Sequence, residues 1–226
     1  MTLTFQATQK LRQDILSGAI NSNDELTERA LCERLGMSRS PVRTALQILA
    51  GEGLLTYSEK RGYRLRKITP SLISNAYEVR AVLEGLACRL LSESRPTSQL
   101  LAELHEELDK GGAILSRYDD YFDTAAWSEM NERFHNIILD GAGNPSLIQA
   151  LKQATGAPLA SFTFTTVFRK QAEWALLQIA HDMHCRIVQA LECGESQRVD
   201  ALMREHIFIA RDLILEELRN SSAGMS

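Results

Sequence analysis

Two of the five histidines are spaced so that their imidazole rings could meet. His184 lies ten residues before Gly194, and His206 lies twelve residues after it. At about 1.5 Å of rise per residue, both rings are roughly 15–18 Å from that turn, so two antiparallel helices would bring them to the same level. Asn131 and His135 are four residues apart and share one face of another helix. Imidazoles hold zinc in proteins, so the chemistry open to this group is metal coordination, with a metal-free polar pocket as the alternative.

Two further groups could bind an anionic small molecule. Arg80 stands within an apolar helical stripe, where it either forms a salt bridge with Glu84 one turn later or binds a carboxylate in bidentate fashion. A hydroxyl-rich run that contains Thr163 is followed by Arg169. This run either lines a pocket or forms an exposed helix face. The candidate contacts to a small effector molecule are therefore Arg80, Thr163 and Arg169.

The residues from Leu26 to Glu52 have the pattern of two short helices around a tight turn. The first is predicted to run from Leu26 to Leu35, and Gly36 ends it because glycine readily adopts the left-handed conformation. Ser38 is a favourable N-cap, and Pro41 suits the first turn of the second helix. This is a helix-turn-helix, whose second helix enters the major groove through its N-terminal residues, here Arg39, Ser40, Arg43 and Thr44. Arginine can bind guanine O6 and N7 together.

A β-hairpin with a basic turn is predicted directly after the helix-turn-helix. Leu54–Tyr57 and Tyr63–Lys67 have strand character, and the turn between them contains Lys60, Arg61 and Gly62. We expect this turn to approach the minor groove or the DNA backbone. Residues 1–67 hold eleven Lys or Arg and seven Asp or Glu, a charge of +4, whereas the remainder holds fourteen and twenty-two, a charge of −8. The basic part is therefore the one expected to bind phosphates.

The rest of the chain predicts a helical bundle, because every long segment after Leu72 has helical periodicity. The predicted helices are Leu72–Ser94, Ser98–Leu115, Tyr118–Leu139, Ser146–Thr155, Leu159–Phe168, Gln171–Leu191 and Ser196–Leu218. An earlier helix, Thr4–Ser17, is expected to bury Phe5, Leu11 and Ile15. The first bundle helix is expected to carry the apolar stripe Ala76, Val79, Val82, Leu83, Leu86 and Leu90. The predicted fold is mainly α, with a winged helix-turn-helix domain (1–67), a linker (68–71), an all-helical bundle of six or seven helices (72–220) and a disordered tail (221–226).

The composition is that of an ordinary globular protein, with 44% hydrophobic and 24% charged residues among 226. No apolar run has the length of a membrane span, and the N-terminus is not a secretory signal. The four cysteines form no CxxC pair and are expected to be reduced thiols. We therefore expect a cytoplasmic protein without a membrane partner.

The N-terminal region, roughly Leu11 to Lys67, resembles the winged-helix domain of the GntR family of bacterial transcription regulators. The residues that carry the resemblance are Leu26–Arg29 with Leu31, Leu35–Arg43, Ala45–Leu46, Gly51–Leu54 and Arg61–Gly62. The chain departs from the family at Asn21–Asn23, where a Pro-Gly turn is usual. The resemblance implies binding to double-stranded DNA, in which we expect Arg39 and Arg43 to read bases and Arg29, Ser38 and Ser40 to fix the register.

The remainder resembles the FCD ligand-binding domain of the FadR branch of this family. The residues that carry this resemblance are Tyr77–Glu84 with Ala87, Phe134–His135, Gly143–Pro145, His184, Ala190–Leu191 with Gly194, Ala201–Met203 and His206. It implies a homodimer whose bundle senses a small molecule, commonly a carboxylate. It also implies that Asn131 and His135 lie opposite His184 and His206, where many members complete an Asp-His-His-His metal site. Asn131 replaces that aspartate with a neutral carbonyl oxygen, so zinc or nickel is expected to be held more weakly.

The predicted function is a sequence-specific DNA-binding transcription regulator, a repressor that binds a pseudo-palindromic operator and is controlled by a small metabolite. One alternative is a metallo-enzyme that uses the histidine cluster. The other is an architectural DNA-binding dimer without an effector. The chain contains no HExxH, GxSxG or P-loop motif, so no enzyme activity is expected. Buried histidines without a role would cost stability, which argues against the architectural alternative.

Overall fold

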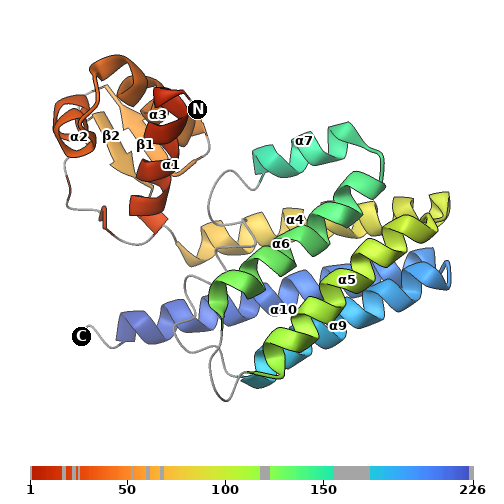
Figure 1. The fold of residues 1–226 in the computed structure, drawn as a ribbon. Helices are drawn as coiled ribbons and strands as arrows, with labels where there is room; N and C mark the ends of the chain where they lie inside the picture. Colours follow the sequence, from red (N-terminus) through yellow and green to blue (C-terminus); the bar gives the residue numbers. More distant parts are fainter. Residues whose placement is uncertain are drawn as a thin grey trace. The chain divides into compact units, whose positions relative to one another are not determined.

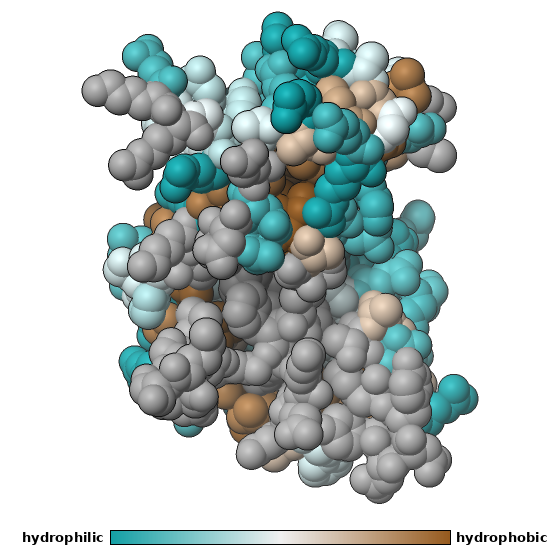
Figure 2. Space-filling model, turned by 90° about the vertical axis from the view of Figure 1, so that its left-hand side faces the viewer, coloured by the Kyte–Doolittle hydropathy of each residue, from teal (hydrophilic) through white to brown (hydrophobic). Residues whose placement is uncertain are grey.

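The computed structural model describes residues 2–16, 19–21, 24, 26–51, 53–59, 62–66, 69–117, 123–154 and 174–223. The chain divides into two compact units, whose described parts end at Thr69 and begin at Pro70, respectively. Most of the described residues are helical, as the sequence predicted. None of the helices in these ranges is long and apolar enough to cross a membrane. Hydrophilic residues make up much of the coloured surface in Figure 2, and apolar residues show between them in smaller areas.

The N-terminal unit consists of three helices and a two-stranded hairpin (Figure 1). Its elements are α1 (Leu3–Leu16), α2 (Glu28–Leu35), α3 (Arg39–Gly51), β1 (Leu55–Ser58) and β2 (Gly62–Leu65). Thr27 is the N-cap of α2, and its hydroxyl accepts a hydrogen bond from the Ala30 amide. Gly36 ends α2 in the left-handed conformation, at φ 63°, as expected.

The structure differs from the prediction at the start of α2. Leu26 was expected to begin this helix, but it instead forms an isolated β-bridge with Tyr63 of the hairpin. Thr27 is extended, so the helix begins only at Glu28. Glu28, the first residue of α2, therefore directly follows a capping residue and stands two residues after the bridge to β2.

The hairpin pairs β1 and β2 in antiparallel register, with Leu55 opposite Leu65 and Ser58 opposite Gly62. Leu55 packs with Leu11, Val42 and other residues of the three helices in one hydrophobic core. Phe5 was predicted to join this core, but its side chain is 46% exposed. The reason is helical geometry, because α1 turns the face that carries Ala7 and Leu11 inward and leaves Phe5 on the opposite side.

The C-terminal unit contains six helices among its described residues (Figure 1). They are α4 (Pro70–Ser94), α5 (Ser98–Leu115), α6 (Thr124–Gly141), α7 (Pro145–Ala154), α9 (Trp174–Glu192) and α10 (Ser196–Ala223). The helix α10 runs along α4 and contacts α9, and α5 contacts both α6 and α9. The predicted helix Leu159–Phe168 lies outside the described residues. Helix α10 extends to Ala223, so the predicted disordered tail is partly helical.

The buried face of α4 includes Ala76 but otherwise departs from the apolar stripe that the sequence indicated. Val79 and Val82 belong to that stripe, yet they are 41% and 49% exposed. The buried face is mostly apolar, but it also contains the charged residues Arg80 and Glu84. This face can be buried because its charged groups pair with one another inside the unit. Gly85 lets α10 approach closely, since a Cβ there would collide with the side chains of Asp200 and Arg204.

Candidate functional site

One face of α3 presents polar side chains to solvent. Its exposed residues include all four that were predicted to enter the major groove: Arg39, Ser40, Arg43 and Thr44. The opposite face is buried in the core through residues such as Val42, Ala45, Leu46 and Leu49. The Thr44 hydroxyl donates to the Ser40 carbonyl at 3.1 Å. Arg29 and Ser38 are also exposed. An exposed polar helix face of this kind is what a major groove accommodates.

Arg43 is held by a residue that the sequence analysis did not select. Its Nε donates to Glu28 Oε1 at 2.7 Å, and its Nη2 donates to Glu28 Oε2 at 3.0 Å. Hydrogen bonding to Arg43 lowers the pKa of the Glu28 carboxyl, so this group is ionised at neutral pH. The two residues are fifteen positions apart, and only the packing of α2 against α3 brings them together.

The hairpin places further basic residues at the surface. Gly62 begins β2 with φ 66°, a left-handed conformation that glycine adopts without strain. Lys60 and Arg61, which were predicted to approach DNA, lie outside the described residues. Arg64 and Arg66 are exposed and were not predicted as contacts. The alternation of β2 provided a signal for Arg64, because it stands two residues beyond Gly62 on the same face of the hairpin.

The C-terminal unit brings three histidines together from three helices. His135 of α6, His184 of α9 and His206 of α10 are 1%, 0% and 5% exposed. His206 Nε2 lies 3.2 Å from His184 Nε2 and 3.3 Å from His135 Nε2. The Gly194 turn is the connection between α9 and α10, so the prediction that His184 and His206 reach the same level is confirmed. These three residues offer nitrogen atoms within 4.8 Å of one another, the spacing expected of metal ligands.

Burial keeps these imidazoles uncharged. It lowers the pKa of His184 well below the usual range, and the neighbouring His206 and His135 act in the same direction. Burial and the neighbouring His135 together lower the pKa of His206 to about 3. Burial also lowers the pKa of His135, although the Glu84 carboxylate opposes this effect. Neutral imidazoles have a free ring nitrogen, which is the form that binds a metal ion.

Glu84 connects the histidines to Arg80. Arg80 Nε donates to Glu84 Oε1 at 2.7 Å, and Glu84 Oε2 lies 2.7 Å from His135 Nδ1 in an oblique contact. Both members of the ion pair are almost fully buried, and Arg80 lies over the ring of Tyr77 at 4.8 Å. Burial alone would raise the pKa of the Glu84 carboxyl, but Arg80 and His135 lower it to about 2. The salt bridge that the sequence offered as one role for Arg80 is therefore present.

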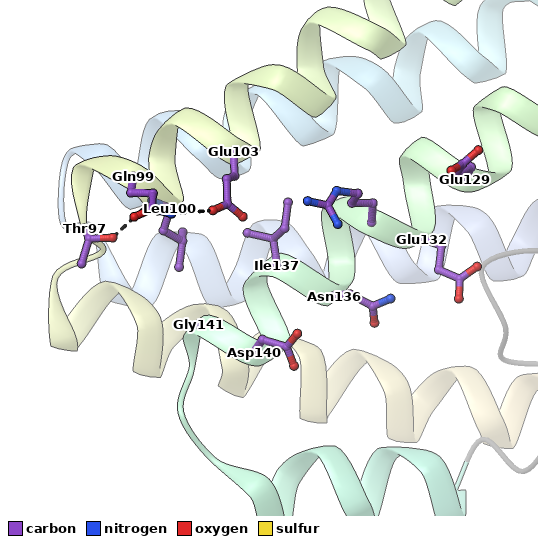
Figure 3. A pocket seen from close by; sticks show the side chains of 11 residues that line it. Thr97, Gln99, Leu100, Glu103, Glu129, Glu132, Asn136, Ile137, Asp140 and Gly141 are labelled. Atoms are coloured by element: carbon purple, nitrogen blue, oxygen red, sulfur yellow. Dashed lines mark hydrogen bonds between the residues drawn. The ribbon is translucent and has the colours of Figure 1, made fainter.

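The remaining predicted site residues are Asn131, Thr163 and Arg169. Asn131 is half-buried and lies one turn before His135 on α6. Thr163 and Arg169 lie outside the described residues. Glu129 and Glu132 of α6 do not face the histidines but line an outer pocket of about 580 Å³ between α5 and α6 (Figure 3). Their carboxylates are exposed, so neither replaces the missing aspartate.

Comparison with known proteins gives matches along most of the chain. The model of the gntR family of bacterial regulatory proteins matches residues 3–65, and that of the FCD domain matches residues 75–208. The Nta operon transcriptional regulator of Aminobacter aminovorans is 27% identical over 88% of both chains. The HTH-type transcriptional repressor GlaR of Escherichia coli is 24% identical over 96% of this chain and 99% of its own. The solved structure of E. coli McbR/YncC superposes with a TM-score of 0.74 at 21% identity, covering 96% and 99% of the two chains.

Proposed function

This chain belongs to the gntR family of bacterial regulatory proteins, carries an FCD domain and is a transcription regulator rather than an enzyme, and from that premise we propose how it works. It binds a pseudo-palindromic operator as a homodimer and represses transcription. A small carboxylate, bound in the helical unit beside a divalent metal, controls its affinity for DNA. The observation that carries the DNA-binding part is the exposed face of α3, on which Arg39 and Arg43 stand beside Ser40 and Thr44.

The residues of this face divide into two roles. Arg39 and Arg43 read base edges in the major groove, because a guanidinium can bind guanine O6 and N7 at once. Arg29, Ser38, Ser40 and Thr44 contact phosphates, which fixes the position of the helix but carries no sequence information. The turn that contains Lys60, Arg61 and Gly62 approaches the minor groove or the backbone, where the left-handed glycine allows a close approach.

Changing Arg43 to alanine is expected to weaken binding to the cognate operator by about 1–3 kcal/mol and to relax its sequence specificity. The reason is that the variant loses base contacts, whereas most phosphate contacts remain. The measurement is a fluorescence anisotropy titration with the operator and with a scrambled duplex, both at the same salt concentration. If the variant binds both duplexes as the wild type does, α3 is not the reading helix.

Dimerisation is supported by the outer face of α4. Val79 and Val82 are exposed on it, and Leu83, Leu86 and Leu90 continue the strip as half-buried residues. A second copy of the chain is the occupant we propose, because a two-fold operator requires two winged helices and a single module buries little surface on DNA. An isologous contact between two α4 helices would cover the same apolar strip on both copies.

The Val82→Arg variant is expected to sediment as a monomer, whereas the wild type sediments at twice 25.3 kDa. A charge in the middle of an apolar interface should raise the dimer dissociation constant by on the order of tenfold or more. Ile179→Arg is the matched control, since Ile179 of α9 is 43% exposed and lies outside this strip. A wild type that is monomeric at micromolar concentration while its operator affinity is high would contradict the proposed dimer.

The metal part of the proposal is supported by the donor set. Tetrahedral zinc with Zn–N bonds of about 2.0–2.1 Å separates two ligand nitrogens by roughly 3.3 Å, and the three Nε2 atoms are spaced at 3.2 and 3.3 Å. A single ring proton makes only one well-directed hydrogen bond among these atoms, whereas a cation accepts the lone pairs of all three. His135, His184 and His206 are the ligands, and Asn131 is the weak fourth.

Glu84 and Arg80 surround the proposed metal site. The contact between Glu84 and His135 Nδ1 orients the imidazole so that Nε2 faces the other two rings, as carboxylates do for ligating histidines elsewhere. A bound metal would act as a Lewis acid that holds a carboxylate oxygen of the effector. Arg80, Thr163 and Arg169 remain the proposed contacts to the rest of that molecule. For Arg80 such a contact requires the effector to share the guanidinium with Glu84.

Control of DNA binding follows from the positions of these groups along the chain. Arg80 and Glu84 belong to α4, which is the first helix after the winged-helix unit. An effector or metal that binds one arrangement of α4, α6, α9 and α10 more tightly than another shifts the population toward that arrangement. The winged-helix units of the dimer then present a different spacing to the operator.

A further inference from the structure

We propose that Glu28 is a specificity-determining positioning residue, whose carboxylate holds one edge of the Arg43 guanidinium so that the opposite edge faces a guanine of the operator. This inference rests on the proposed role of Arg43 in base reading. Glu28 does not touch DNA in this arrangement and acts only through Arg43.

The geometry of the pair leaves the reading edge of Arg43 free. Glu28 takes the Nε–H and one N–H of Nη2, at 2.7 and 3.0 Å, which is the side-on edge of the guanidinium. An arginine has five N–H donors, so both N–H groups of Nη1 and the second of Nη2 are not used by this contact. Those donors form the end-on edge, whose spacing matches O6 and N7 of guanine.

The backbone of Glu28 is held in place by contacts of the residues before it, so its carboxylate can orient the Arg43 guanidinium. Glu28 is the first residue of α2, directly after the Thr27 cap that accepts from Ala30. Leu26, which precedes the cap, is buried and bridges to Tyr63 of the hairpin. The carboxylate thus reaches Arg43 from the junction of α2 and β2, and an arginine that is oriented in advance loses less freedom when it binds.

The pair is not placed to stabilise the fold. The side chain of Arg43 is 59% exposed and that of Glu28 is 29% exposed. Exposed ion pairs contribute little to stability, because water screens the charges and the side chains lose freedom on pairing. A carboxylate close to the DNA-reading face also repels phosphates, which weakens binding to any sequence. Glu28 thus stabilises the fold little and weakens DNA binding. An increase in discrimination between bases would explain why a carboxylate stands at this position.

The test uses the full-length protein and the duplex that the wild type selects from a random-sequence pool. Each base pair of that duplex is substituted in turn, and dissociation constants are measured for the wild type, Arg43→Ala and Glu28→Gln. Arg43→Ala identifies the base pair that Arg43 reads, because substitutions there cease to matter. Glu28→Gln is expected to reduce discrimination at that base pair by about three- to tenfold, to leave the other positions unchanged and to bind a scrambled duplex at least as tightly as the wild type.

The control is Glu33→Gln, which removes the same charge from the same helix. Glu33 lies at 3.9 Å from Arg29 in an exposed pair and does not contact Arg43, so discrimination should be that of the wild type. In the Glu28→Gln, Arg43→Ala double variant, discrimination should equal that of Arg43→Ala alone. The melting temperature of Glu28→Gln should stay close to that of the wild type, which a structural role would not allow.

Failure of this inference differs from failure of the proposed function. If Arg43→Ala leaves every base preference unchanged, Arg43 does not read DNA and both ideas are wrong. If Arg43→Ala relaxes one position and Glu28→Gln keeps wild-type discrimination there, only the role of Glu28 is overturned. A uniform loss of discrimination at all positions in Glu28→Gln would also overturn it, because that pattern indicates a displaced helix rather than a misoriented arginine.

Discussion

Zinc or nickel added to chelator-treated protein is expected to raise the melting temperature of the helical unit by about 5–10 °C when the metal is at a hundredfold excess over its dissociation constant. The physical reason is mass action, since three imidazoles from three helices are close together only in the folded state. Protein purified without a metal-affinity tag should contain metal by mass spectrometry, although Asn131 makes a fraction below one per chain the expected result.

His184→Gln is expected to abolish this thermal shift. The comparison is made between metal-free and metal-loaded samples of the same variant, so any loss of stability from the substitution itself cancels. His105→Gln is the control, because His105 is exposed on α5, pairs with Glu192 at 2.8 Å and lies outside the cluster. Asn131→Asp should increase the shift, since a carboxylate attracts a dication more strongly than an amide oxygen.

One result would remove the metal from the proposal. In that result the wild type contains little metal, and neither zinc nor nickel changes its melting temperature. Its response to added metal is then the same as that of His184→Gln. The buried histidines would then form a metal-free polar pocket. The effector could still bind there, so a thermal-shift screen of small carboxylates with and without a chelator separates the effector from the metal.

Glu84→Gln is expected to lower the free energy of unfolding of the helical unit by about 3–5 kcal/mol, because it removes the carboxylate that neutralises the buried charge of Arg80. Glu84 is 1% exposed and Arg80 is 2% exposed, so water cannot compensate for the loss. The measurement is urea denaturation followed by circular dichroism at a fixed protein concentration, with chelator present so that metal binding does not contribute.

The same helix provides a matched control. Arg89 and Glu93 have the same four-residue spacing and lie 3.2 Å apart, but both are substantially exposed. Glu93→Gln should therefore change the free energy of unfolding by less than about 1 kcal/mol. Adding Arg80→Met to Glu84→Gln should recover part of the loss, because no charge is then left in the interior. Equal effects of Glu84→Gln and Glu93→Gln would contradict the account of a buried pair.

Local chemistry made the winged helix predictable from the sequence. Gly36 and the apolar spacing around it identified the two helices of the helix-turn-helix, because a left-handed cap and helical periodicity are properties of neighbouring residues. The same local reasoning misplaced Leu26. Its apolar side chain is compatible with either a helix or a bridge, and only contact with Tyr63 of the hairpin decided between them.

Helix periodicity was a poorer guide in α4. The sequence shows an apolar stripe with Val79 and Val82, and a soluble helix normally buries such a stripe. The structure instead buries a face that is mostly apolar but includes Arg80 and Glu84. Charges can occupy an interior when they neutralise one another, and that condition depends on partners which periodicity does not include.

The sequence by itself determined the family of the chain, the exposed face of α3 and the meeting of His184 with His206. The family follows from the motif residues that resemble it, and the other two follow from spacing within one helix or across one short turn, where a fixed rise per residue converts sequence distance into position. The tertiary structure alone decided that Glu28 holds Arg43 and that Glu84 meets His135. Glu28 and Arg43 are fifteen residues apart, and Glu84 and His135 are fifty-one apart. Contacts of this kind depend on how whole helices pack, and a single sequence contains no local pattern that specifies which carboxylate meets which base.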